Sequence, residues 1–163
     1  MKLDVLGIGH ALLESIVRVD DPLLDSLGLR KSEMFLVDDL QYAVILEQVN
    51  SRRAIVSSGG SCANTIETLA MLGLQTGFVG TVGRDAQGDM FEKEMTQMGA
   101  HTQLTRLDTA ATGHTVTLVT PDGERTFATY LGAAALLSKA NIDESQIKDA
   151  GVLHLEGYAF DSK

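Results

Sequence analysis

A glycine pair followed by polar residues is the segment of this sequence best suited to bind a hydroxylated ligand. Gly59 and Gly60 precede Ser61, and Asn64 follows four residues after the second glycine. Glycines allow close approach of a ligand, backbone N–H groups at a helix start attract electronegative groups, and an amide supplies both a donor and an acceptor. The segment lacks the Lys-Ser/Thr of a phosphate-binding Walker loop. The pattern indicates a polyol site, with a structural turn before a helix as the alternative.

An earlier glycine pair lies near the N-terminus, at Gly7 and Gly9, directly before His10. The spacing is that of a dinucleotide-binding fingerprint, but the third glycine position holds Leu12, whose side chain would block the approach of a pyrophosphate. We therefore disfavour a nicotinamide- or flavin-dependent oxidoreductase, and a tight structural turn is the simpler interpretation. His10 is the one histidine singled out for function, because the four histidines show no metal-ligand spacing.

Two further reactive residues have structural interpretations. Asp85 follows a glycine-rich strand end, but Gln87 and Gly88 break the ligand order of a calcium loop, so we expect Asp85 to cap a helix. Cys62 has no cationic neighbour in sequence to activate its thiol, so we expect a small core residue rather than a nucleophile. A single cysteine also excludes an internal disulfide, which favours a reducing, cytoplasmic setting.

The elements that position these residues alternate between strands and helices. Short apolar runs predict buried strands, period-two alternation predicts more exposed strands and a hairpin, and Asp or Ser before an apolar period predicts helix caps. Ser61 is the expected cap of its helix, and Gly73 and Gly99 are expected helix ends. The expected strands are 4–8, 14–19, 34–37, 54–56, 77–82, 114–119, 125–130 and 152–155, and the main helices begin near 38, 61, 85 and 143.

This order predicts an α/β fold with a doubly wound, mostly parallel sheet and a small additional sheet. The 163 residues, 44% hydrophobic, suit one domain. The formal charge of −9 argues against binding to nucleic acid or an anionic membrane. No apolar run approaches the roughly 20 residues that span a bilayer, so we expect neither a signal peptide nor a membrane anchor.

Taken together, the motifs resemble those of the N-terminal half of ribokinase-like (PfkB-type) carbohydrate and nucleoside kinases. The resemblance rests on the strand ending in Gly-Ile-Gly, on Ser58-Gly59-Gly60-Ser61-Cys62-Ala63-Asn64-Thr65, and on Gly80-Thr81-Val82-Gly83-Arg84-Asp85-Ala86-Gln87-Gly88. The segments 119–126 (Val-Thr-Pro-Asp-Gly-Glu-Arg-Thr) and 130–134 (Tyr-Leu-Gly-Ala-Ala) are similar to the adenosine-kinase-related branch.

The resemblance implies a ribokinase-like fold with a β-sheet lid from strands near 14–19, 34–37 and 114–130. It implies transfer of the γ-phosphoryl of ATP to a hydroxymethyl group of a sugar or nucleoside. The implied substrate contacts are His10, Glu14, Gly59, Gly60, Asn64 and Glu156. The family usually has Asn at position 10 and Asp at position 14. The extra methylene of Glu14, about 1.5 Å, is enough to shift a substrate that it contacts.

The family's catalytic signature, Gly-Ala-Gly-Asp, is absent from this sequence. We therefore expect a single truncated domain over 1–163 that is inactive alone, with no catalytic and no metal-binding residues of its own. ATP and Mg²⁺ belong to the complete enzyme, and neither is expected to bind this chain tightly. A non-catalytic α/β binding or assembly module that keeps the sugar pocket is the alternative. An incomplete sheet exposes its edge, so we expect a homo-oligomer through the lid or that edge.

Overall fold

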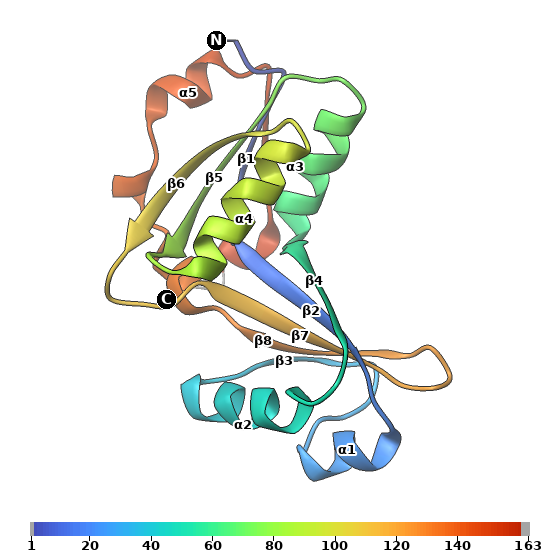
Figure 1. The fold of residues 1–163 in the computed structure, drawn as a ribbon. Helices are drawn as coiled ribbons and strands as arrows, with labels where there is room; N and C mark the ends of the chain where they lie inside the picture. The colour runs from blue at the N-terminus through green and yellow to red at the C-terminus, as the bar shows by residue number, and fades with distance from the viewer. Residues whose placement is uncertain (1, 161–163) are drawn as a thin grey trace.

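The computed structural model describes residues 2–160, which form two β-sheets with helices on both (Figure 1). The first sheet is parallel throughout, in the order β6-β5-β1-β9. Its strands are β1 (Val5–Ile8), β5 (Thr76–Gly83), β6 (His101–Leu107) and β9 (Val152–Leu155). Helices α3 (Ser61–Met71) and α4 (Ala86–Gln97) cover one face, and α5 (Glu144–Asp149) lies on the other (Figure 1). The expected doubly wound α/β architecture is confirmed.

The second sheet is mixed and has the order β3-β8-β7-β2-β4. Its strands are β2 (Leu12–Arg18), β3 (Met34–Leu36), β4 (Ala54–Gly59), β7 (Gly113–Val119) and β8 (Arg125–Tyr130). Helices α1 (Asp21–Ser26) and α2 (Asp39–Val49) pack on one face of it (Figure 1). The strands expected for a lid therefore form one sheet, joined by β4.

Each sheet has its own core. Cys62 and Ile66 of α3 and Phe91 of α4 pack with Phe78 of β5, and all four are buried. The covered face of the mixed sheet buries Leu118 and its neighbours against α1 and α2. On the far face of the parallel sheet, two 3-10 turns accompany α5, η1 (Gly132–Leu136) and η2 (Lys139–Asn141), and a third, η3 (Gly157–Phe160), follows β9. The prediction that Cys62 is a core residue is confirmed, and burial followed by the charge of Glu156 raises the pKa of its thiol to about 12.

Asp85 caps α4, as expected, by accepting the backbone N–H of Gly88 at 2.8 Å. It also accepts the Thr112 hydroxyl at 2.6 Å and the Thr112 N–H at 2.8 Å. Thr112 directly precedes β7, so one carboxylate ties the helix of the parallel sheet to the mixed sheet. The glycine-rich segment 80–88 therefore has a structural role. Gly83 leaves room for these contacts, because a Cβ there would lie 2.4 Å from the Asp85 carboxylate.

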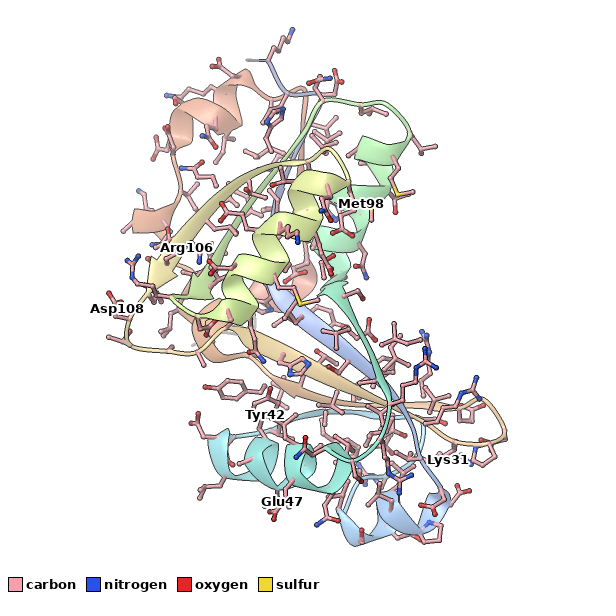
Figure 2. All side chains as sticks on the ribbon, in the orientation of Figure 1. Lys31, Tyr42, Glu47, Met98, Arg106 and Asp108 are labelled. Atoms are coloured by element: carbon pink, nitrogen blue, oxygen red, sulfur yellow. The ribbon has the colours of Figure 1, made fainter. Side chains whose placement is uncertain are left out.

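A second polar joint lies on the covered face of the mixed sheet. The Tyr42 hydroxyl of α2 hydrogen-bonds Nδ1 of His114, whose Nε2 is 2.8 Å from the Ser15 hydroxyl. Tyr42 lies between its helix and the strands (Figure 2) and stacks on Tyr130 with ring centroids 4.9 Å apart. Burial lowers the pKa of His114 to about 4. With both ring nitrogens engaged inside the protein, His114 has a structural role.

Three features differ from the sequence expectations. Strand β6 was not predicted, because its polar residues lie at the sheet edge and show no apolar alternation. Strand β4 extends to Gly59 and pairs antiparallel with β2 in the mixed sheet. Ser61 is the first residue of α3 and not its cap. The N-cap is Gly60, with φ +98°, and as a glycine it has no side chain to accept a hydrogen bond from the helix end.

Candidate functional site

A cavity of about 530 Å³ lies where the uncovered face of the mixed sheet meets the first turn of α3. Its lining comes from four strands (β2, β3, β7 and β8), from the start of α3, and from the segments that follow β1, β8 and β9. The lining residues are His10, Leu12, Glu14, Met34, Leu36, Gly60, Ser61, Asn64, Thr115, Phe127, Thr129, Leu131, Ala135, Glu156 and Tyr158. The cavity thus brings together five of the six predicted contacts.

The register of the mixed sheet explains why Glu14 faces the cavity. Directly paired residues share a face, and Glu14 pairs with Thr115, which pairs with Thr129, which pairs with Leu36. The Thr115 and Thr129 hydroxyls are 3.1 Å apart. This row runs across the cavity wall, with hydroxyls and a carboxylate at one end and an apolar side chain at the other.

The Glu14 carboxylate is positioned before any ligand binds. Its Oε1 accepts the Thr117 hydroxyl at 2.5 Å, from the neighbouring position along β7 on the same face. The second carboxylate oxygen has no protein partner among the described residues. Glu14 can therefore accept a hydrogen bond from a ligand hydroxyl while Thr117 holds its orientation.

The Glu156 carboxylate lies at the floor of the cavity and is 5% exposed. Oε1 accepts the His10 backbone N–H at 2.6 Å and is 3.2 Å from Nδ1 of His10. Oε2 accepts the Ser61 hydroxyl at 2.9 Å and the Cys62 N–H at 3.1 Å. Glu156, from the end of β9, caps α3 in place of the expected Ser61 cap.

Two glycines make this floor possible. A Cβ at Gly60 would lie 2.7 Å from the His10 carbonyl oxygen, and its φ of +98° disfavours any L side chain. A Cβ at Gly9 would lie 2.8 Å from the Glu156 carboxyl carbon. The α3 start therefore packs directly on the backbone of the loop after β1, and that loop packs directly on the side chain of Glu156.

Gly59 is the one predicted contact that does not line the cavity. It ends β4 beside Leu12, and a Cβ there would lie 3.1 Å from Cβ of Glu14. Asn64 lies one helical turn beyond Gly60, with its backbone N–H bonded to the Gly60 carbonyl at 2.9 Å. Its exposed amide is free to reach a ligand.

The cavity also has an apolar wall that was not predicted from the sequence. Met34, Leu36, Phe127, Leu131 and Tyr158 line it from β3, β8 and the segments that follow the strands. Met34 and Leu36 are 47% and 62% exposed, which is unusual for apolar residues paired within a sheet. The only available signal was alternation in 34–37 and 125–130, which does not tell a ligand-facing side from a core-facing one.

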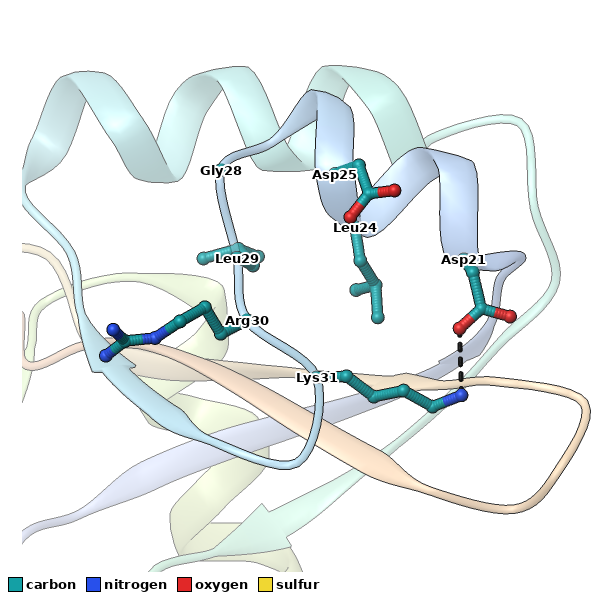
Figure 3. Close-up of a pocket in the computed structure, with 7 residues that line it drawn as sticks. All are labelled: Asp21, Leu24, Asp25, Gly28, Leu29, Arg30 and Lys31. Carbon is teal, nitrogen blue, oxygen red and sulfur yellow. Dashed lines mark hydrogen bonds and ion pairs between the residues drawn. The ribbon is translucent and has the colours of Figure 1, made fainter.

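A second cavity, of about 460 Å³, lies between α1 and the loop at 28–31 (Figure 3). Lys31 crosses its mouth and pairs with Asp21 at 2.8 Å and Asp122 at 2.5 Å. The hydrogen bonds that Lys31 donates to Asp122 and then to Asp21 raise the pKa of Lys31. Both basic residues of this cavity are paired with carboxylates of the protein, Lys31 as above and Arg30 with Glu33, so the first cavity is the better candidate.

The described residues do not fit a nucleoside triphosphate or its metal. No lysine or arginine lines the first cavity, and α3, whose N-terminus could bind a phosphate, is capped by Glu156. Within residues 2–160 no three His, Cys, Asp or Glu side chains are grouped to hold a metal ion. In the same part of the chain, no helix has the length and apolarity needed to cross a bilayer.

Comparison with known proteins identifies the family of the chain. The model of the pfkB family carbohydrate kinases matches residues 35–163. The crystal structure of adenosine kinase from Sinorhizobium meliloti superposes with a TM-score of 0.91 at 33% identity, covering 100% of this chain and 50% of that one. A probable sugar kinase from Rhizobium etli CFN 42 gives a TM-score of 0.91 at 32% identity, covering 49% of that chain. The chain belongs to the PfkB carbohydrate kinase family, and its fold is ribokinase-like.

Curated relatives point to the same family. Adenosine kinase 2 of Arabidopsis thaliana is 28% identical over 134 residues, which are 80% of this chain and 38% of the relative. The ATP-dependent ribose-1-phosphate kinase of Halopiger xanaduensis is 31% identical over 120 residues, 73% of this chain and 40% of the relative. The chain thus spans about two fifths of the curated relatives and half of the solved structures that it matches.

Proposed function

We propose that this chain is the substrate-binding half of an ATP-dependent kinase that phosphorylates a hydroxymethyl group of a nucleoside or sugar. The observation that carries the proposal is the single cavity shared by His10, Glu14, Gly60, Asn64 and Glu156. Family membership supports the reaction class, and homologous adenosine kinases support a nucleoside over a free sugar.

The cavity has a polar side and an apolar side, which suits a nucleoside. Glu14 and Asn64 can hydrogen-bond vicinal hydroxyls of a ribose, and the bare backbone of Gly60 lets the ring approach. Leu36 and Phe127 offer a flat apolar surface to a base. In this arrangement the ribose lies toward α3 and the base toward β3 and β8, under a mixed sheet that serves as the lid.

Phosphoryl transfer needs groups that the described residues do not provide. It requires positioned phosphates, charge neutralisation and a base near the attacking hydroxyl, and the sequence has no Gly-Ala-Gly-Asp. Glu14 is engaged in hydrogen bonding and Asp85 in capping. ATP and Mg²⁺ are therefore assigned to the complete enzyme, and we propose that this chain binds substrate without turnover.

Calorimetric titration of the purified chain with adenosine, inosine and ribose tests the binding half of the proposal. Adenosine or inosine should bind more tightly than ribose, because only a nucleoside has a base that can pack against the apolar wall. Incubation with ATP, Mg²⁺ and each ligand should give no phosphorylated product. Absence of any nucleoside or sugar binding contradicts the proposed function, and robust turnover contradicts the assignment of catalysis to the complete enzyme.

A further inference from the structure

The anion-binding end of α3 is already filled by a side chain of the protein itself. The N-terminus of an α-helix carries a partial positive charge and free N–H groups that favour an anion. Here the Glu156 carboxylate accepts the Cys62 N–H and the Ser61 hydroxyl with Oε2, and the His10 N–H with Oε1. These partners come from two separate segments. Because the carboxylate already accepts their N–H and O–H groups, it takes the place that a phosphate or carboxylate of a ligand would occupy.

The remaining charges around the cavity have the same sign. Glu14 is the second carboxylate of the wall, and the described lining residues include no lysine or arginine. His10 is the one basic side chain there, and its Nδ1 already faces Glu156 at 3.2 Å. A ligand phosphate near the α3 end would meet two carboxylates and no unpaired cation.

We infer that Glu156 is a specificity-determining residue that keeps an anionic group of a ligand, such as a phosphate, away from the α3 end of this cavity. It acts as a built-in anion: it satisfies the helix end and holds the His10 loop, and a ligand phosphate would face like charge there. Like charges placed together across an interface are strongly unfavourable. The inference rests on the proposed function for the identity of the ligand, but the exclusion itself follows from the contacts of Glu156.

Substituting the residue should remove the charge that repels an anion at the helix end. Glu156→Gln keeps the size of the side chain and removes its charge, so inorganic phosphate near the Cys62 N–H and the α3 end no longer faces a carboxylate from this residue. Ser61→Ala is the matched control, because it deletes one hydrogen bond to Glu156 but leaves the carboxylate in place. Circular dichroism of each variant establishes that it is folded.

Titration of inorganic phosphate, followed by amide shifts of Ser61 and Cys62, provides the test. The native chain and Ser61→Ala should not bind phosphate, and folded Glu156→Gln should bind it at least about tenfold more tightly than the native chain. If folded Glu156→Gln gains no phosphate affinity, the inference is wrong.

A competition in the native chain tests the inference without any variant, because loss of the buried carboxylate could prevent folding. Ribose should bind at least about tenfold more tightly than ribose 5-phosphate, and native binding of the phosphate at equal or higher affinity overturns the inference. If the chain binds neither ribose nor adenosine, the proposed function fails. The phosphate titrations still decide the role of Glu156 in that case.

Discussion

The Glu156 carboxylate accepts the backbone N–H of His10 at 2.6 Å, although 146 positions separate the two residues in the sequence. This contact joins the loop after β1 to the end of β9 beneath the cavity. The polar contacts proposed for a ribose are thereby built on a packed floor rather than on a mobile loop. Preorganisation of this kind lowers the cost of binding.

Glu14→Gln should weaken nucleoside binding by about tenfold or more, because a hydrogen bond to a charged acceptor contributes about 1.5–3 kcal/mol. The amide retains an acceptor for the Thr117 hydroxyl, so thermal stability should change little. Isothermal titration with adenosine measures the affinity. Unchanged affinity would show that the ligand does not contact Glu14.

Asn64→Ala should reduce adenosine affinity about fivefold, the effect of one neutral hydrogen bond of about 1 kcal/mol. The side chain is exposed and the helix tolerates alanine well, so the melting temperature should stay the same or rise. Thr68→Ala, one turn further along α3 and outside the cavity lining, is the control and should bind adenosine normally. Equal losses in both variants would argue for a general effect on α3.

Asp85→Ala should lower the free energy of unfolding by about 1–3 kcal/mol, through loss of the α4 cap and of the Thr112 bonds. Burial raises the pKa of Asp85, but hydrogen bonds from Thr112 and from the backbone outweigh it and hold the pKa below its ordinary 3.8. The stability from this carboxylate is therefore present above pH 3.8 and is lost as the pH falls further.

Urea unfolding at pH 7 and below pH 3.8 measures this difference. The difference in the free energy of unfolding between the native chain and Asp85→Ala should be smaller below pH 3.8 than at pH 7. The control is Asp108→Ala, which removes an exposed partner of Arg84 at the edge of the molecule (Figure 2). A gap that is the same at both pH values would refute the electrostatic part of the prediction.

Much of the architecture, but less of the site, could be predicted from sequence. Apolar runs such as 4–8 and caps such as Asp38 and Asp85 are local signals, and the structure contains the elements that they predict. The cap of α3 could not be predicted locally, because its acceptor is Glu156, 95 positions from Ser61. Strand β6 lacked a pattern because an edge strand does not need two apolar faces.

Glu67→Gln should stabilise the chain at neutral pH. Burial first, and then the charge of Glu94, raise the pKa of Glu67 against the opposing hydrogen bond from Ser58. The folded state favours protonated Glu67. The stability that the protonated side chain contributes is therefore present below its ordinary pKa of 4.5 and is lost as the pH rises through its pKa in the folded state.

Melting temperatures at pH 4 and pH 7 provide the measurement. Glu67→Gln should melt higher than the native chain at pH 7, with a smaller difference at pH 4. Glu47→Gln, an exposed glutamate on α2 (Figure 2), is the control and should show no pH-dependent gain. A lower melting temperature of Glu67→Gln at pH 7 would contradict the assignment.

The edge strand β9 should promote self-association at high concentration. Within residues 2–160 no strand pairs with its outer side, and Val152 and Leu155 are 57% and 44% exposed. Such an edge pairs readily with another chain. Light scattering should show oligomers that Val152→Lys reduces, whereas Leu72→Lys, on an exposed residue beyond α3, should leave them in place. A native chain that is monomeric at all concentrations would contradict this prediction.

The most direct test of the account is a titration of the isotopically labelled chain with adenosine, followed by backbone amide shifts. The proposed site predicts saturable shifts at Glu14 of β2 and at Gly60 and Asn64 of the α3 start, two segments that share one cavity. Shifts confined to the second cavity, around Leu24 and Lys31, or no saturable shifts at all, would contradict it.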